Sequence, residues 1–258
     1  MKRAISILFV VSCLAVANSS QTPDTPTPVP VLVELFTSEG CSSCPPADAW
    51  LQRLDSAQPV PGARLIVLSE HVDYWNHDGW KDPYSSSSIT ERQSDYVKAL
   101  GLETPATPEV IVDGAVVLHL ADAQQVKQTL QQAANTTVIP VRIASVDADP
   151  GNPGALRARI EVDGSQAPHN ADIYEALALN HAESQVLHGE NSGKHLEHTA
   201  VLQSLTKIGK VEKGKNFSRE IEIKLKPGTD PKNIRLVVFA QVPGPGKVLG
   251  AAMQQGIR

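Results

Sequence analysis

Two cysteines three positions apart, Cys41 and Cys44, are the residues of this chain best suited to chemistry. They follow a β-rich apolar run at 31–36 and precede a segment, 47–54, whose apolar residues recur at helical spacing. Two thiols at the start of a helix can form a disulfide across one turn. The free backbone N–H groups and the helix dipole there favour a thiolate on the first thiol. The pattern therefore predicts a redox-active pair with an exposed sulfur.

A structural disulfide that only staples the turn is the alternative interpretation. The loop between Cys41 and Cys44 contains two residues. Cross-linking so short a loop stabilises a fold little, because the entropic gain grows with loop length. We therefore favour the redox-active interpretation.

The segments after the cysteines predict alternating strands and helices. An apolar run of strand length at 65–68 is followed by a polar, aromatic-rich insertion at 71–84. The further expected elements are a helix capped by Ser88 or Thr90, a strand at 109–112, a two-residue turn at Asp113-Gly114, a strand at 115–120 and a helix capped by Asp122.

This order of elements resembles the α/β fold of the thioredoxin superfamily over residues 31–135. Thr107-Pro108 falls where that superfamily places a cis-proline opposite the CxxC, with Pro105 as a rival position. The resemblance implies that Cys41 attacks and that Cys44 resolves the mixed disulfide. It also implies that Thr107-Pro108 orients the backbone of a partner protein that carries thiols or disulfides. It implies no cofactor.

The resemblance to thioredoxin has departures around the cysteines. Gly40 precedes Cys41 in place of Trp, and Pro45 follows Cys44 in place of a basic residue. Glu34, on the first strand, is a candidate for the buried acid that assists proton transfer in thioredoxin. These departures leave the redox potential and the direction of electron flow open.

The remaining residues, 136–258, predict a second, antiparallel domain that is β-sandwich-like. Apolar and polar residues alternate at 156–163, as in a half-buried strand, and turns rich in Gly and Pro separate this run from its neighbours. We place the domain boundary near Thr136. Further strands are expected at 138–146, 171–180, 199–208, 217–225 and 234–242.

Two polar segments could form an accessory site. Without a functional role, the first segment, 71–84, would be an aromatic lid and the second, 189–198, a solvated hairpin tip. Two histidines beside two thiols could alternatively complete a copper or zinc site, since thiolate and imidazole suit both metals. The insertion contributes His71, Asp73, Trp75, His77 and Trp80, and the loop 189–198 contributes Glu190, Asn191, His195 and His198.

These two segments resemble one family of secreted bacterial proteins of unknown function, in which a thioredoxin-like half precedes a β domain. The resemblance is carried by His-Val-Asp-Tyr-Trp from His71, by Gly-Trp-Lys-Asp-Pro-Tyr from Gly79 and by Gly-Glu-Asn from Gly189. It implies the fold, export and the CxxC, and it implies no substrate.

The N-terminal sequence predicts export. Residues 1–17 combine a basic start, an apolar stretch and small residues at the end, as in a cleaved signal peptide of a secreted or periplasmic protein. Because the apolar stretch continues past Cys13, a lipoprotein attached there is the second choice. Residues 18–30, rich in Pro and Thr, predict an extended linker.

The charge argues against nucleic acid as a partner. Cleavage after residue 17 would remove two basic residues and change the net charge from −5 to −7, and a negative protein repels phosphate backbones. No other segment is apolar enough to predict a membrane span.

Three hypotheses follow. The first is a thiol–disulfide oxidoreductase that acts on protein thiols. The second is a copper- or zinc-handling module that uses Cys41, Cys44 and histidines of the insertion. The third is a non-catalytic protein that binds a partner on a thioredoxin-like scaffold.

Overall fold

The computed structural model describes residues 27–77, 79–136, 138–149, 151–152 and 154–257. The expected signal peptide, Cys13 and most of the expected linker lie outside these residues. Within the described part of the chain, no helix is both long and apolar enough to cross a membrane.

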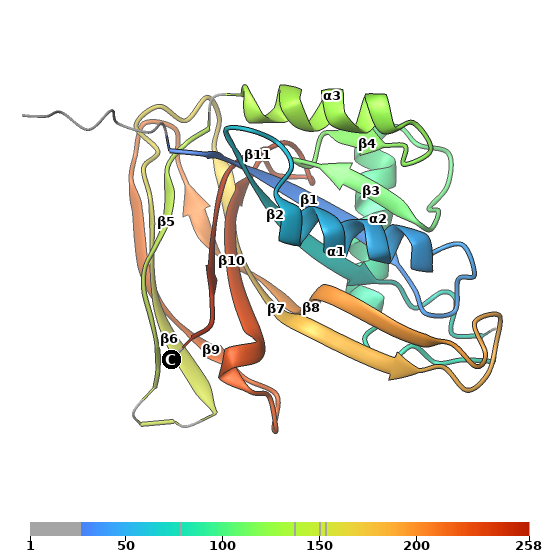
Figure 1. Cartoon of the computed structure of the whole chain (residues 1–258). Coiled ribbons are helices and arrows are strands. Elements are labelled where there is room, and N and C mark those ends of the chain that lie inside the picture. The colour runs from blue at the N-terminus through green and yellow to red at the C-terminus, as the bar shows by residue number, and fades with distance from the viewer. Residues whose placement is uncertain (1–26, 78, 137, 150, 153, 258) are drawn as a thin grey trace, which may run out of the picture.

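The helices and strands follow one another along the chain as in Figure 1. In order they are β1 (Val29–Thr37), α1 (Pro45–Ala57), β2 (Ala63–His71), α2 (Ser87–Leu100), β3 (Glu109–Val112), β4 (Val116–Leu118), α3 (Ala123–Ala134), β5 (Val141–Ala148), β6 (Ala155–Val162), β7 (Ala171–Gln185), β8 (His195–Val211), β9 (Phe217–Lys224), the short 3₁₀ helix η1 (Pro231–Asn233), β10 (Ile234–Gln241) and β11 (Val248–Gln255).

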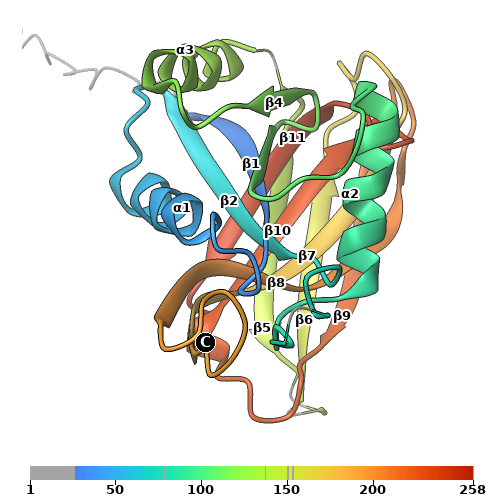
Figure 2. The same ribbon diagram turned by 90° about the vertical axis from the view of Figure 1, so that its right-hand side faces the viewer.

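Eight strands form one mixed sheet in the order β11-β10-β7-β8-β2-β1-β3-β4. β1 and β2 are parallel, which requires a crossover connection, and α1 supplies it. β3 is antiparallel to β1, and β4 is antiparallel to β3. Alternate residues of β1 face opposite sides of the sheet, so Val33 and Leu35 pack in the core beneath α1 and α3, whereas Leu32 and Phe36 pack in the core on the α2 side. Figure 2 shows α2 on the side of the sheet opposite to α1 and α3.

The large sheet continues across the expected domain boundary. β8 lies beside β2, with Ser69 paired to Val201, and β7 and β8 form a long hairpin. A second sheet, β5-β6-β9, packs against the C-terminal part of the first, and Leu156 and Ile221 meet Ile173 and Leu236 in the core between them. The strands on either side of Thr136 therefore belong to one continuous sheet.

Local sequence signals predicted the cap of α3 correctly and that of α2 incorrectly, and β7 and β8 are longer than expected. Asp122 caps α3 as expected, because its carboxylate accepts from the N–H groups of Gln124 and Gln125, both at 3.0 Å. The cap of α2 is Ser86, not Ser88 or Thr90, since its side chain accepts from the N–H group of Ile89. β11 was not expected from the sequence.

A buried ion pair joins α1 to the C-terminal half. Arg235 of β10 is 2% exposed, and its guanidinium donates to both carboxylate oxygens of Asp55 at 3.1 and 2.8 Å. Its Nε donates to Oδ1 of Asn180 at 2.9 Å. A bidentate ion pair fixes the orientation of the two side chains as well as their separation. It therefore holds α1 and β10 in one relative position.

On the α2 side of the sheet, two buried carboxylates share one arginine. Arg92 donates from Nε to Glu34 at 2.9 Å, and the same nitrogen lies 3.5 Å from Glu70. Burial, together with the negative charge of Glu34, raises the pKa of Glu70 well above 4.5. Glu34, suggested from the sequence as an acid that serves the cysteines, therefore lies on the other side of the sheet from α1 and pairs with Arg92.

Replacing Glu70 by Gln should stabilise the protein, relative to wild type, as the pH rises above 4.5. In that range the folded wild type keeps Glu70 protonated while the unfolded chain releases the proton, so rising pH favours unfolding. Glutamine cannot ionise. The difference between the two free energies of unfolding should widen by up to about 1.4 kcal/mol per pH unit, until the pH reaches the pKa of Glu70 in the fold.

Urea unfolding at a series of pH values measures this difference. Glu91→Gln, at an exposed position of α2 next to Arg92, is the matched control and should show no such widening. A difference between Glu70→Gln and wild type that does not change with pH would contradict the prediction.

Candidate functional site

The two cysteines lie at the start of α1. Cys44 is the N-cap residue, and Pro45 and Pro46 occupy the first turn. Proline suits this turn because its missing N–H group would have no helical partner there. Cys41 and Cys44 are joined by a disulfide, with Cα atoms 5.4 Å apart.

Both cysteines are fully buried, at 0% exposure, and the expectation of an exposed sulfur is therefore wrong. The Sγ atom of Cys41 lies 3.3 Å from Oγ of Ser43 and 3.8 Å from the carbonyl oxygen of Thr107. A Cβ at Gly40 would lie 2.9 Å from Cβ of Trp75, so only glycine fits between Trp75 and the cysteine loop. The burial results from segments that are distant in sequence and close over the helix start.

Thr107 and Pro108 lie beside the disulfide. The peptide bond between them is the only cis bond among the described residues, which excludes the rival position at Pro105. Nε1 of Trp75 donates to Oγ1 of Thr107 at 2.7 Å. The insertion therefore holds the residue whose carbonyl faces Cys41.

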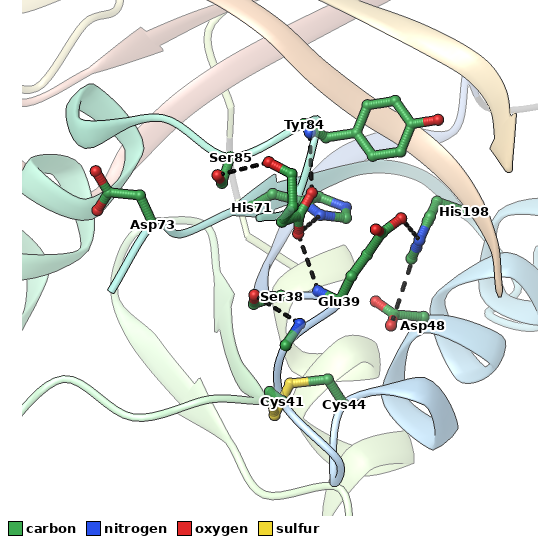
Figure 3. Close-up of polar contacts among 12 residues, drawn as sticks. Ser38, Glu39, Cys41, Cys44, Asp48, His71, Asp73, Tyr84, Ser85 and His198 are labelled. Carbon is green, nitrogen blue, oxygen red and sulfur yellow. Dashed lines mark hydrogen bonds and ion pairs between the residues drawn. A yellow bond between two sulfur atoms is a disulfide. The ribbon is translucent and has the colours of Figure 1, made fainter. Parts of the chain in front are cut away.

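Asp82 connects the insertion to the loop before the cysteines. Its carboxylate accepts from the backbone N–H groups of Glu39 and Tyr84, both at 2.9 Å, and lies 2.7 Å from Nδ1 of His71 (Figure 3). Burial alone would raise the pKa of Asp82, but His71 and these hydrogen bonds lower it below its usual value. Burial alone would lower the pKa of His71, but Asp82, Asp48 and Glu39 raise it above 6.5. The two shifts favour an ion pair between His71 and Asp82.

Glu39 is the residue at which the segments of the site meet. Its buried carboxylate accepts from Nε1 of Trp80 at 2.7 Å and lies 3.1 Å from Nε2 of His198. Its backbone carbonyl accepts from Nδ2 of Asn191 at 2.8 Å. The insertion and the β7–β8 hairpin therefore both contact a residue that lies two positions before Cys41.

A further buried carboxylate, Asp48, lies one helical turn after Cys44. Its Oδ2 is 4.0 Å from Nδ1 of His198, whose ring packs edge-on against the ring of His71 with centroids 4.7 Å apart (Figure 3). Burial raises the pKa of Asp48, although the charges of His198 and His71 act in the opposite direction. Three buried atoms, Oδ1 of Asp48, Nε2 of His71 and Nδ1 of His198, have no hydrogen-bond partner in the described part of the chain. The region behind the disulfide thus holds groups that can take up or release protons.

The tip of the β7–β8 hairpin, residues 186–194, closes the site. Figure 2 shows it beside the loop that joins β1 to α1. Oε2 of Glu190 accepts from the backbone N–H group of Ser42 at 3.1 Å. Asn191 is fully buried and donates to the carbonyl oxygens of the two residues that flank Gly40, at 2.8 and 2.9 Å. The loop at 189–198 therefore does approach the cysteines.

Two of the residues suggested from the sequence, Asp73 and His195, form their side-chain contacts away from this site. Asp73 accepts from Oγ1 of Thr90 at 2.6 Å, near the start of α2. His195 is half exposed and pairs with a glutamate across the hairpin at 3.2 Å. His77 lies at an exposed position. His195 and His198 are three positions apart on one strand, so they face opposite sides of it and only His198 turns inward.

Sequence reasoning missed the three carboxylates Glu39, Asp48 and Asp82. A signal existed for Asp48, because it follows Cys44 by four positions and so shares its helix face. Asp82 lies within the Gly-Trp-Lys-Asp-Pro-Tyr segment that carries the family resemblance, but no signal marked it individually, and none marked Glu39.

Among the described residues, no group of three His, Cys, Asp or Glu side chains is arranged to hold a metal ion. His71, the insertion histidine that reaches the site, directs Nδ1 at Asp82 and packs its ring against His198. With Cys41 and Cys44 joined in a disulfide, these described side chains are not arranged as a cysteine–histidine copper or zinc site.

Comparison with known families gives one match over most of the chain. Residues 32–241 match the family described as "Protein of unknown function (DUF1223)". This protein belongs to that family. No curated protein matches the chain.

Two solved structures are similar in fold. The crystal structure of protein AGR_C_4864 from Agrobacterium tumefaciens is 24% identical in sequence, covers 89% of this chain and 95% of its own, and gives a TM-score of 0.67. HBP35 of Porphyromonas gingivalis is 16% identical, covers 88% of this chain and 75% of its own, and gives a TM-score of 0.67. At these identities the likeness concerns the fold alone.

Replacing Asp82 by Asn should lower the pKa of His71. Burial is the largest influence on this histidine and lowers its pKa, and Asp82 is the main group that opposes burial. Titration of the His71 ring protons by NMR measures the change. Asp73→Asn, in the same insertion but bonded to Thr90, is the control and should leave this pKa unchanged. An unchanged His71 pKa in Asp82→Asn would show that the ion pair does not exist.

Proposed function

We propose that this protein is an exported, thioredoxin-like thiol–disulfide exchange protein that acts on the thiols or disulfides of other proteins. One observation carries the proposal. The Cys41–Cys44 disulfide lies at the start of α1, beside Thr107-Pro108, and the buried carboxylates of Glu39 and Asp48 precede and follow the pair in the sequence. A purely structural disulfide across a two-residue loop would add little to the stability of the fold and would not require buried carboxylates before and after it.

The arrangement of the N-terminal elements supports the thioredoxin-like assignment. The strands lie in the order β2-β1-β3-β4, with β1 and β2 parallel and β3 antiparallel, and the helix that follows the cysteines packs on one face of this sheet. Along the chain, the order strand, helix, strand, helix, strand, strand, helix is the one that the sequence suggested for residues 31–135.

The proposed exchange takes two steps. The Cys41 thiolate attacks one sulfur of a partner disulfide, which forms a mixed disulfide and releases one partner thiolate. The Cys44 thiolate then attacks Sγ of Cys41, which restores the intramolecular disulfide and releases the second partner thiolate. The partner disulfide gains two electrons and the pair loses them. The reverse sequence oxidises a partner dithiol.

Asp48 is suited to handle the proton of Cys44 in this scheme. The thiol of Cys44 must lose its proton before it attacks, and Asp48 lies one turn further along the same helix. Burial raises the pKa of Asp48 and one of its oxygens has no hydrogen-bond partner, so it binds a proton more readily than an exposed aspartate does.

Exchange also requires a local opening, because both sulfurs are buried. The hairpin tip is the segment best placed to move, since Glu190 and Asn191 make its hydrogen bonds to the cysteine loop. Openings of this kind cost less free energy than unfolding of the whole domain.

Reduction of a model protein disulfide tests the proposal. In the presence of dithiothreitol, the wild-type protein should accelerate the reduction of insulin, and Cys41→Ser should reduce the rate to that of dithiothreitol alone. Cys44→Ser should accumulate a covalent complex with insulin, because the resolving thiol is missing. Non-reducing electrophoresis and mass spectrometry detect this complex.

Cys41→Ser is the matched control for the trapping experiment, since it also leaves one free cysteine in the pair but removes the proposed nucleophile. Wild-type protein that does not accelerate reduction, with no complex formed by Cys44→Ser, would refute the proposed function. The disulfide would then be structural.

A further inference from the structure

Asn191 of the hairpin tip makes the most specific contact with the cysteine loop. Its side chain is fully buried. The Nδ2 group donates to the carbonyl oxygen of Glu39 at 2.8 Å and to that of Cys41 at 2.9 Å. One amide from the C-terminal half therefore binds the backbone of the loop both before and after Gly40.

The orientation of this amide is fixed within the tip itself. Nζ of Lys194 donates to Oδ1 of Asn191 at 2.8 Å, which leaves Nδ2 directed at the cysteine loop. The tip turns through Gly189 and Gly193, whose φ angles of 79° and 83° suit glycine. The N–H group of Gly193 donates to the carbonyl of Val186 at 2.8 Å, which closes the tip on itself.

The carbonyl of Cys41 has a second donor. The backbone N–H group of Cys44 donates to it at 3.2 Å, and this hydrogen bond closes the turn that brings the two sulfurs together. Asn191 binds the same oxygen. Holding that carbonyl therefore also holds the turn.

We propose that Asn191 is a positioning residue for the disulfide. By binding the carbonyls of Glu39 and Cys41, it keeps the turn closed and the two sulfurs within bonding distance, so that it favours the disulfide over the dithiol. A contact that fits the closed turn better than the relaxed one must shift the equilibrium toward the closed form. The biological use of this effect rests on the proposed function. The effect itself concerns only the equilibrium between the disulfide and the dithiol of Cys41 and Cys44.

Asparagine has the chemistry that this position needs. Its amide offers two N–H donors on one nitrogen and an oxygen for Lys194. Aspartate has nearly the same shape but no donor, and would place a carboxylate against two carbonyl oxygens. Alanine removes the contact altogether.

The test is to equilibrate wild type, Asn191→Ala and Asn191→Asp with mixtures of reduced and oxidised dithiothreitol. Alkylation and mass spectrometry give the fraction of dithiol, and the approach to equilibrium gives the rate of reduction. Both variants should shift the equilibrium toward the dithiol by about fivefold or more, as expected for the loss of one or two hydrogen bonds. Asn152→Ala, in an exposed turn between β5 and β6, is the control and should behave as wild type.

The equilibrium constant distinguishes positioning from mere coverage. If Asn191 only shielded the sulfurs from the reductant, its loss would speed reduction without changing the equilibrium between disulfide and dithiol. A changed rate with an unchanged equilibrium constant would therefore overturn the proposal. So would no change in either. If the wild-type disulfide stays oxidised throughout, variants that become reducible support the proposal, and variants that remain equally resistant refute it.

A second variant covers the case in which the Asn191 variants fail to fold. Lys194→Met keeps the amide but removes the contact that orients it, and should shift the equilibrium in the same direction by a smaller factor. No shift in that variant would then count against the proposal. If the protein failed only in the insulin assay, the proposed function would be refuted. The effect of Asn191 on the equilibrium between disulfide and dithiol would still be tested by these variants.

Discussion

The burial of a carboxylate two residues before Cys41 is the constraint on which the arrangement of the site depends. Glu39 is 1% exposed, and a buried charge is tolerated only where hydrogen bonds or opposite charges compensate for the lost water. Trp80 from the insertion and His198 from β8 provide this compensation. Because Glu39 needs both partners, the insertion and β8 are held against the loop that carries Cys41.

The shared sheet makes this convergence possible. β8 lies beside β2, and the pairing of Arg235 with Asp55 fixes α1 against β10, so the C-terminal half presents its hairpin tip to the start of α1. The disulfide is therefore enclosed by residues from both halves of the chain. In the proposed function, its reactivity depends on how easily these contacts open, in addition to the chemistry of the sulfurs themselves.

The parts of this structure that follow from local pattern could be predicted. The cis bond at Pro108 was expected from the resemblance to the thioredoxin superfamily. The disulfide pair, the helix that follows it and the cap at Asp122 are marked by short stretches of sequence. These features depend on hydrogen bonds or spacings within a few residues, which is why one sequence suffices to find them.

The parts set by contacts between distant segments could not be predicted. Thr107 contacts the Cys41 sulfur and Asn191 of the hairpin tip binds the Cys41 carbonyl, from 66 and 150 positions away in the sequence. Likewise, Asp82 becomes important only once β1, β2 and the insertion meet. Strand alternation could have separated His198 from His195, but only with the strand register known.

The most direct measurement compares the rate of disulfide reduction in the native protein with the rate of global unfolding. If opening of the hairpin tip gives access to a redox-active pair, reduction by dithiothreitol should be much faster than unfolding and should increase in proportion to the dithiothreitol concentration. A reduction rate that levels off at the rate of global unfolding would contradict this, because the sulfurs would then be reached only when the whole fold is lost.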